Sequence, residues 1–73
     1  MNNLKIQDLI KKGDALVEAE QYQDALDVFD QALAIGTTDN NIEKKLLGEK
    51  VFLLNKMGRF LEANAIAQTI SKH

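Results

Sequence analysis

The stretch from Gly13 to Ile35, GDALVEAEQYQDALDVFDQALAI, decides the fold of this 73-residue chain. It predicts one helical hairpin, in which a first helix ends near Glu20 and a second helix begins near Tyr22. The second helix carries small and large apolar residues in alternation: Ala25 and Leu26, Val28 and Phe29, Ala32 and Leu33. A single hairpin cannot bury such a face alone, so we expect another element to stack on it.

Composition is that of an ordinary globular protein with a single domain. Apolar residues form 45% of the chain and charged residues 27%, and there is neither proline nor cysteine. The formal charge of −2, without clustered cations, argues against a nucleic-acid partner. The first ten residues lack the apolar core of a signal peptide, and no run reaches transmembrane length. We therefore expect a cytoplasmic protein with no membrane partner.

Apolar periodicity predicts four helices over residues 4–19, 22–35, 41–57 and 59–71. Gly36 supplies a left-handed residue after the second helix, and Gly58 stops the third. Asn40 and Glu43 have the spacing of a capping box, which predicts the start of the third helix. The connections are short, so neighbouring helices should pack antiparallel.

The two halves of the chain are related by one constant shift in residue number, which we call the repeat shift. It places Leu9 on Leu47, Lys12 on Lys50, Leu16 on Leu54, Tyr22 on Phe60 and Ala25 on Ala63. Each second helix begins with an aromatic residue and has alanine three positions later, which argues against chance. We infer two copies of one hairpin.

These residues resemble the tetratricopeptide repeat (TPR) family. Gly13, Tyr22, Ala25, Phe29 and Ala32 reproduce the family's spacing of small and aromatic residues, and Leu9 and Leu16 stand where bulky residues are preferred. The resemblance covers residues 6–39 as a first repeat and 44–73 as a divergent second one, within a single domain of residues 1–73. It implies an all-α fold of two antiparallel hairpins stacked as a short right-handed solenoid. In that family, the first helix of each hairpin lines a groove that binds peptides or protein surfaces.

Three features depart from the family pattern. The repeat shift exceeds the family period of about 34 residues by about four residues. The second copy has Val51 where glycine or alanine is usual and Ala67 where an aromatic residue is usual. Lys12 and Lys50 occupy positions that are usually apolar, so we expect their stems to lie along the core and their ammonium groups to reach water.

A helical projection places one set of residues on the side that faces the groove in the family. The candidate groove residues are Gln7, Ile10, Asp14 and Val17 from the first helix, and Lys45, Phe52, Asn55 and Lys56 from the third. In the functional interpretation, Ile10, Val17 and Phe52 are apolar anchors for a protein or peptide partner. In the alternative, Ile10 and Val17 pack between helices, and Phe52 covers the backbone beside Gly48. The family's lysine and asparagine clamp for a terminal carboxylate is absent.

The last helix indicates where the stack ends. Asn64 and Ser71 stand where the second helix has Leu26 and Leu33, so its outer face is more polar. The narrow apolar strip of Ile66, Ala67 and Ile70 still leaves room for a partner there.

The sequence offers no constellation for catalysis or for a cofactor. Asp24, Asp27 and Asp30 spread around an exposed helix face, which favours a solvated surface over a metal site. His73, the single histidine, is the last residue. We therefore expect a small protein-interaction module or adaptor and not an enzyme. One alternative is a homodimeric structural subunit, because three or more repeats are usually needed for stability and a dimer would supply the missing burial. A second alternative is a regulatory subunit of a larger complex.

Overall fold

The computed structural model describes residues 2–37 and 39–71, and over these ranges it contains four α-helices and no strand. The helices are α1 (Asn2–Glu18), α2 (Tyr22–Ile35), α3 (Asn40–Lys56) and α4 (Phe60–Ser71). The all-α prediction is confirmed, and every observed helix end lies within two residues of its expected position. The expectation for His73 lies outside the described residues. None of the four helices has the length and apolar character needed to cross a membrane.

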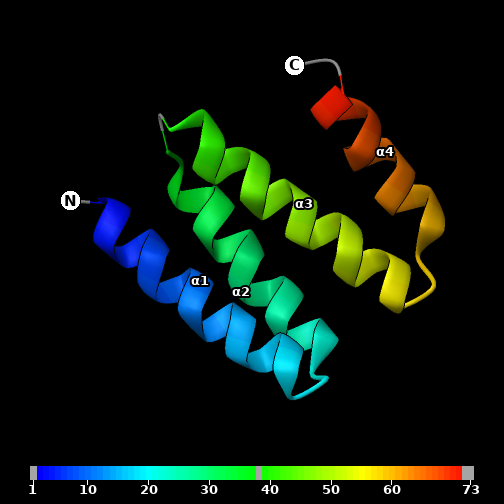
Figure 1. The fold of residues 1–73 in the computed structure, drawn as a ribbon, viewed down its shortest axis with the longest axis horizontal. Helices are drawn as coiled ribbons and strands as arrows, with labels where there is room; N and C mark the ends of the chain where they lie inside the picture. The colour runs from blue at the N-terminus through cyan, green and yellow to red at the C-terminus, as the bar shows by residue number, and fades with distance from the viewer. Residues whose placement is uncertain (1, 38, 72–73) are drawn as a thin grey trace.

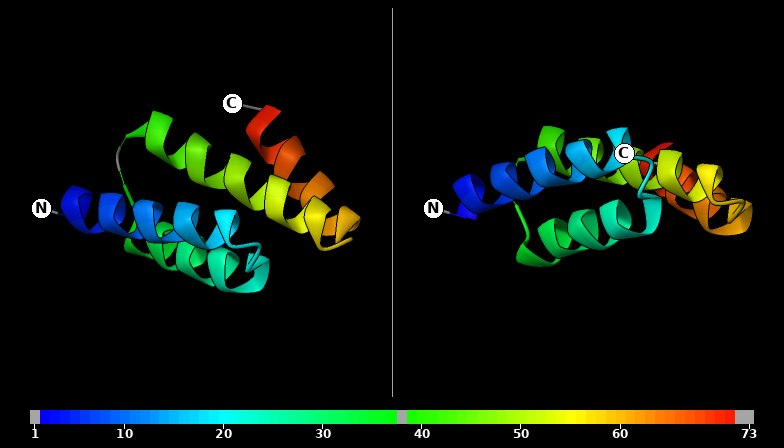
Figure 2. Two further views of the ribbon diagram at one scale, coloured as in Figure 1. Left: turned by 60° about the horizontal axis from the view of Figure 1, so that its bottom comes forward. Right: turned by 90° about the horizontal axis from the view of Figure 1, so that it is seen from below.

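Each helix packs against the next one along the chain. Contacts join α1 to α2, α2 to α3 and α3 to α4, and Figure 1 shows that successive helices run in opposite directions. The Cα atoms span 34 × 32 × 15 Å, and the smallest dimension is that of two helix layers. In the right-hand view of Figure 2, α2 lies below α1, whereas α3 begins at the level of α1. In such a thin molecule each helix keeps an exposed side.

The core is apolar and is centred on Phe29. No polar or charged residue among those described is buried, and the Phe29 side chain is 0% exposed. A Cβ atom added to the buried Gly13 would lie 2.6 Å from two carbons of the Phe29 ring, so α1 needs glycine at this point. This contact joins α1 to α2.

The two turns within the helix pairs have the same geometry and are related by the repeat shift. Glu20 has φ 61° and Gly58 has φ 78°, both in the left-handed region. Gln21 N donates to Leu16 O at 2.9 Å, and Arg59 N donates to Leu54 O at 2.8 Å. In addition, α1 and α3 begin and end at positions that the repeat shift makes equivalent. The sequence repeat is therefore also a repeat of backbone geometry.

The start of α3 differs from the prediction by one residue. The N-cap is Asp39 and not Asn40, because Asp39 Oδ1 accepts hydrogen bonds from Asn41 N at 2.9 Å and Ile42 N at 3.4 Å. Asn40 already belongs to the helix. The capping-box prediction was wrong because aspartate and asparagine cap helices about equally well, and two such residues are adjacent here.

An ion pair supports the contact between α2 and α3. Lys50 Nζ lies 2.7 Å from Asp30 Oδ1, and the Lys50 side chain is 22% exposed. Lys50 thus lies along the core as expected, but its ammonium group contacts a carboxylate. Asp30 is correspondingly not a purely solvated residue. Lys12, the equivalent of Lys50 in α1, is exposed.

In the second helix pair, the large and the small residue at one pair of equivalent positions have changed places. Gly13 on α1 faces Phe29 on α2, whereas the equivalent residues are the half-buried Val51 and Ala67. The larger side chain has moved from the second helix of the pair to the first. This exchange leaves each pair with one large and one small residue at the equivalent positions, although those of the second pair are less buried.

Candidate interaction surface on α3

The exposed side of α3 forms a continuous stripe of residues. Because α3 packs against both α2 and α4, its apolar residues turn toward those helices and one side stays free. Beyond the first turn, the exposed residues of α3 are Lys44, Lys45, Gly48, Phe52, Asn55 and Lys56. We call these six residues the α3 stripe. It holds three lysines and no carboxylate, and the half-buried Glu49 lies beside it.

Phe52 is the apolar centre of the α3 stripe. Its side chain is 44% exposed, as expected from its position opposite the buried side of the helix. Lys56 Nζ lies 5.5 Å from the centroid of the Phe52 ring. At an exposed site such a cation–π contact contributes about 0.5–1 kcal/mol. The ring therefore keeps an accessible surface and carries a cation over its face.

Gly48 lowers the helix surface between Lys44 and Phe52. An added Cβ atom would have no neighbour within 4 Å, so no side chain of the described residues covers this position. No atom of the Phe52 ring lies within 4 Å of this Cβ position. Unlike Gly13, Gly48 has no steric role inside the chain, although glycine in a helix costs about 1 kcal/mol relative to alanine.

The candidate residues on α1 divide into two groups. Gln7 and Asp14 are exposed, whereas Ile10 and Val17 are half-buried and pack against the core. Ile10 and Val17 therefore fit the alternative interpretation, in which they pack between helices, better than that of exposed anchors. Of the eight candidate groove residues, the structure brings Phe52 and Lys56 into direct contact, and both come from α3.

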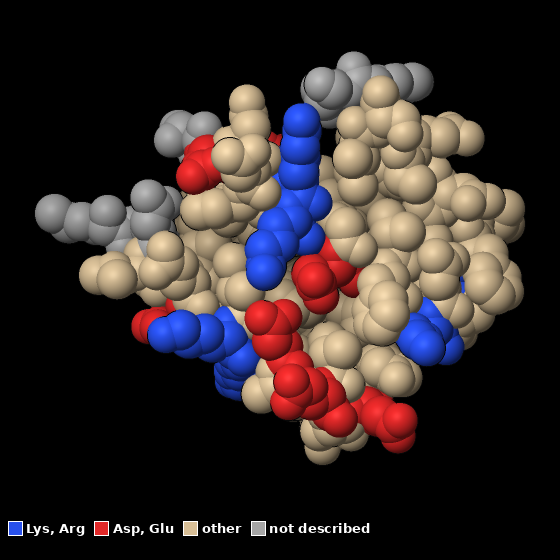
Figure 3. All heavy atoms as spheres, viewed as in Figure 1, with Lys and Arg blue, Asp and Glu red and all other residues tan. Residues whose placement is uncertain are grey.

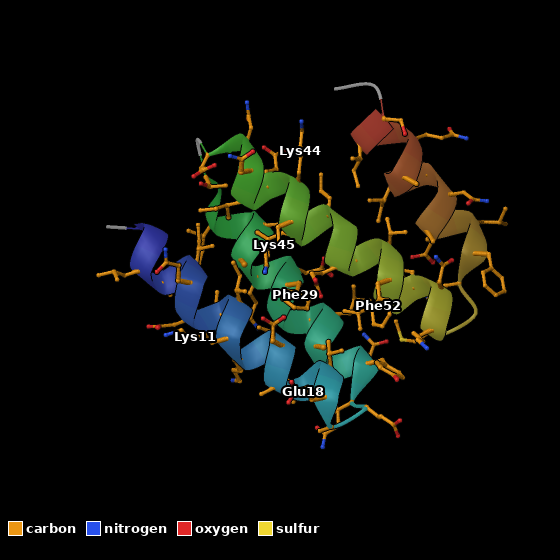
Figure 4. The ribbon with its side chains drawn as sticks, viewed as in Figure 1. Lys11, Glu18, Phe29, Lys44, Lys45 and Phe52 are labelled. Carbon is orange, nitrogen blue, oxygen red and sulfur yellow. The ribbon has the colours of Figure 1, made fainter. Side chains whose placement is uncertain are left out.

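Charges of both signs lie on this side of the molecule. Figure 3 shows cationic atoms over the first half of α3 and over α1, and acidic atoms beside the cationic atoms of α3 and lower on the same face, over the end of α1. Figure 4 identifies Lys44 and Lys45 at the start of α3, Phe52 further along it, and Glu18 near the end of α1. An acidic ligand would be attracted to the α3 stripe and repelled by Asp14 and Glu18.

A hollow of about 190 Å³ lies at the edge of the α3 stripe. It is lined by Asn40, Glu43, Lys44, Leu47 and Ile70. These residues come from the start of α3 and the end of α4, where the two helices diverge in Figure 1. The apolar strip that contains Ile70 can be recognised in the sequence, but the hollow cannot be predicted from it. One signal of the hollow was present in the sequence: under the repeat shift, Lys44 stands where the first helix pair has the aliphatic Ile6.

Comparison of the chain with protein-family models, with curated proteins and with solved structures finds no match. Within residues 2–37 and 39–71, no group of three or more histidine or acidic side chains is placed to hold a metal ion. What the surface offers chemically is an exposed aromatic ring, three exposed lysines and an adjacent hollow with both polar and apolar walls.

Proposed function

We propose that the protein is a small protein-interaction module, built from two TPR-like helical hairpins, that binds a protein or peptide through the α3 stripe. The repeated turn geometry supports the two-hairpin interpretation, as do the equal lengths of α1 and α3. The contact of α3 with both α2 and α4 is what a stack of two hairpins requires. A short right-handed solenoid is the arrangement that the family resemblance implies.

The observation that carries this proposal is the exposure of Phe52. The core is complete without it, because Leu46, Leu53 and Leu54 of the same helix are fully buried. A large apolar side chain left exposed among lysines and an asparagine resembles the centre of a binding surface, where an aromatic anchor is surrounded by polar groups. One helix face gives a small contact area, so we expect an affinity on the order of micromolar.

The polar ends of the stack favour a different protein as partner over a second copy. Leu46 of α3 packs at 0% exposure, and its equivalent on α1 is the exposed Asp8. On the outer face of α4, Asn64 and Ser71 are exposed where α2 has Leu26 and Leu33. A second copy that continued the stack would have to remove Asp8, Asn64 and Ser71 from water, which costs free energy wherever a hydrogen bond is not made.

Capture of partners by matched baits tests the proposal. The wild-type chain and the variants Phe52→Ala and Leu61→Ala are immobilised and exposed to a lysate of the cells that make the protein. Leu61 is 87% exposed but lies at the start of α4, so it controls for general surface stickiness. We expect a protein that is retained by the wild type and by Leu61→Ala and lost by Phe52→Ala. The captured protein is then purified, and direct binding is measured together with the melting temperature of each bait.

Two results would contradict the proposal. One is equal retention by Phe52→Ala and the wild type in direct binding measurements. The other is a large loss of stability in Phe52→Ala with unchanged binding, which would make Phe52 a core residue.

A further inference from the structure

The first helix pair shows what fills the place of the hollow. Under the repeat shift, Lys44, Leu47 and Ile70 of the hollow correspond to Ile6, Leu9 and Ala32. Ile6 is 0% exposed and belongs to the core cluster together with Ala32, and Leu9 packs against that cluster. In the second pair the equivalent residue is the exposed Lys44. The hollow between α3 and α4 therefore marks the position at which the first pair buries an aliphatic side chain.

This internal comparison defines the shape and polarity of the site. Leu47 and Ile70 supply apolar walls, and Asn40, Glu43 and Lys44 supply polar ones. A branched aliphatic side chain from outside the chain would contact Leu47 and Ile70, the equivalents of Leu9 and Ala32 in the pair that buries Ile6. Burial of such a side chain should strengthen binding roughly tenfold to a hundredfold, a substantial part of a micromolar affinity.

Charge indicates which chain would carry that side chain. Lys44 belongs to both the hollow and the α3 stripe, and Lys45 and Lys56 extend the cationic surface along the helix. Lys50 and Arg59 are paired with Asp30 and Glu62. The stripe from Lys45 to Lys56 is about 16 Å long at about 1.5 Å per residue, which about five residues of extended chain would span.

We propose that the partner presents an acidic segment with one branched aliphatic residue at an end. That residue enters the hollow between α3 and α4, and the carboxylates of the segment follow the α3 stripe past Gly48 and Phe52. The segment lies along α3, away from Asp14 and Glu18 on α1. This inference rests on the proposed function and adds the chemistry of the ligand to it.

Synthetic peptides of seven residues serve as probes. The first has isoleucine at one end, then two acidic residues, two serines and two acidic residues, and a second has the reverse order because the direction of binding is not fixed. Matched peptides replace isoleucine with alanine, or all acidic residues with their amides. We expect the better isoleucine peptide to bind the wild type at least about tenfold more tightly than its alanine or amide counterpart, a difference of about 1.4 kcal/mol. Raising the salt concentration should weaken binding of the acidic peptides alone.

Three lysine variants distinguish the effect of filling the hollow from the effect of removing a positive charge. Lys44→Ile supplies the side chain that the first pair has at this position, so it should raise the melting temperature and abolish the preference for isoleucine over alanine. Lys44→Gln removes the same charge without filling the hollow, so it should weaken binding but keep that preference. Lys12→Gln removes a lysine from the opposite end of the stack and should leave both properties unchanged.

Specific outcomes would overturn the inference. It fails if the wild type does not distinguish isoleucine from alanine, if the amide peptides bind as well as the acidic ones, or if Lys44→Ile keeps the preference. In each of those cases a Phe52-dependent partner captured from lysate would still support the proposed function. If instead no partner depends on Phe52 for its capture, the proposed function is contradicted.

Discussion

Replacement of Gly13 by alanine tests the contact on which the core is built. In an exposed helix, glycine to alanine stabilises by about 1 kcal/mol. Here the new Cβ atom would lie 2.6 Å from Cε1 and Cζ of Phe29, a ring with no exposed surface into which it could turn. Overpacking of this kind costs roughly 1–3 kcal/mol, so we expect Gly13→Ala to gain nothing or to lose stability. The matched control is Gly48→Ala, because Gly48 is also within a helix and has open space around it.

The assay is thermal and chemical unfolding followed by circular dichroism. The difference between the two alanine variants should be about 1–3 kcal/mol, and each kcal/mol corresponds to roughly 4–8 °C in a domain of this size. Phe29→Ala should itself cost about 3–5 kcal/mol, out of a total stability of roughly 4–11 kcal/mol for 73 residues. In the Phe29→Ala background, the Gly13→Ala change should become as favourable as Gly48→Ala. Equal effects of the two alanine substitutions in the wild-type background would refute this reasoning.

Three further predictions concern the cap, the ion pair and the end of the stack. Asp39→Ala should lower the free energy of unfolding by about 0.5–2 kcal/mol, because it removes the hydrogen bonds from Asn41 N and Ile42 N, whereas Asn40→Ala should change it little. If urea unfolding shows a larger loss for Asn40→Ala than for Asp39→Ala, the N-cap is Asn40 and not Asp39. A double-mutant cycle on Lys50 and Asp30 should give a coupling of at most about 1 kcal/mol that falls with salt, and a salt-independent value would contradict it. Asn64→Leu combined with Ser71→Leu should promote association in light scattering across a concentration series, and a double variant as monomeric as the wild type would rule out the end-cap interpretation.

The helices could be predicted from the sequence because several local signals agreed. Gly13, Ala25 and Phe29 fixed the close contact within the first pair, and the repeat shift carried the helix ends to the second pair. The cap of α3 was missed because Asp39 and Asn40 are neighbours with similar propensities. The ion pair between Lys50 and Asp30 could not be predicted, because it depends on how α3 rotates against α2.

The candidate surface was only partly predictable for a similar reason. Helical periodicity placed Phe52, Lys45 and Lys56 on the exposed side of α3, because exposure on one helix follows from its own pattern. Ile10 and Val17 turned out to be mostly packed, because α1 has its buried side at a different angle from α3. The hollow depends on the divergence of α3 and α4, a property of tertiary packing that periodicity does not contain.

Chemical-shift mapping tests the central claim, the binding of a partner by the exposed side of α3, most directly. The isotopically labelled chain is titrated with the acidic isoleucine peptide, and its backbone amide signals are followed. The account predicts that the largest changes fall on Lys44, Lys45, Gly48, Phe52 and Lys56 and on the walls of the hollow at Leu47 and Ile70. Signal changes that are confined to α1, or to the exposed Phe60 and Leu61 at the start of α4, would contradict the account. So would the absence of any change at saturating peptide.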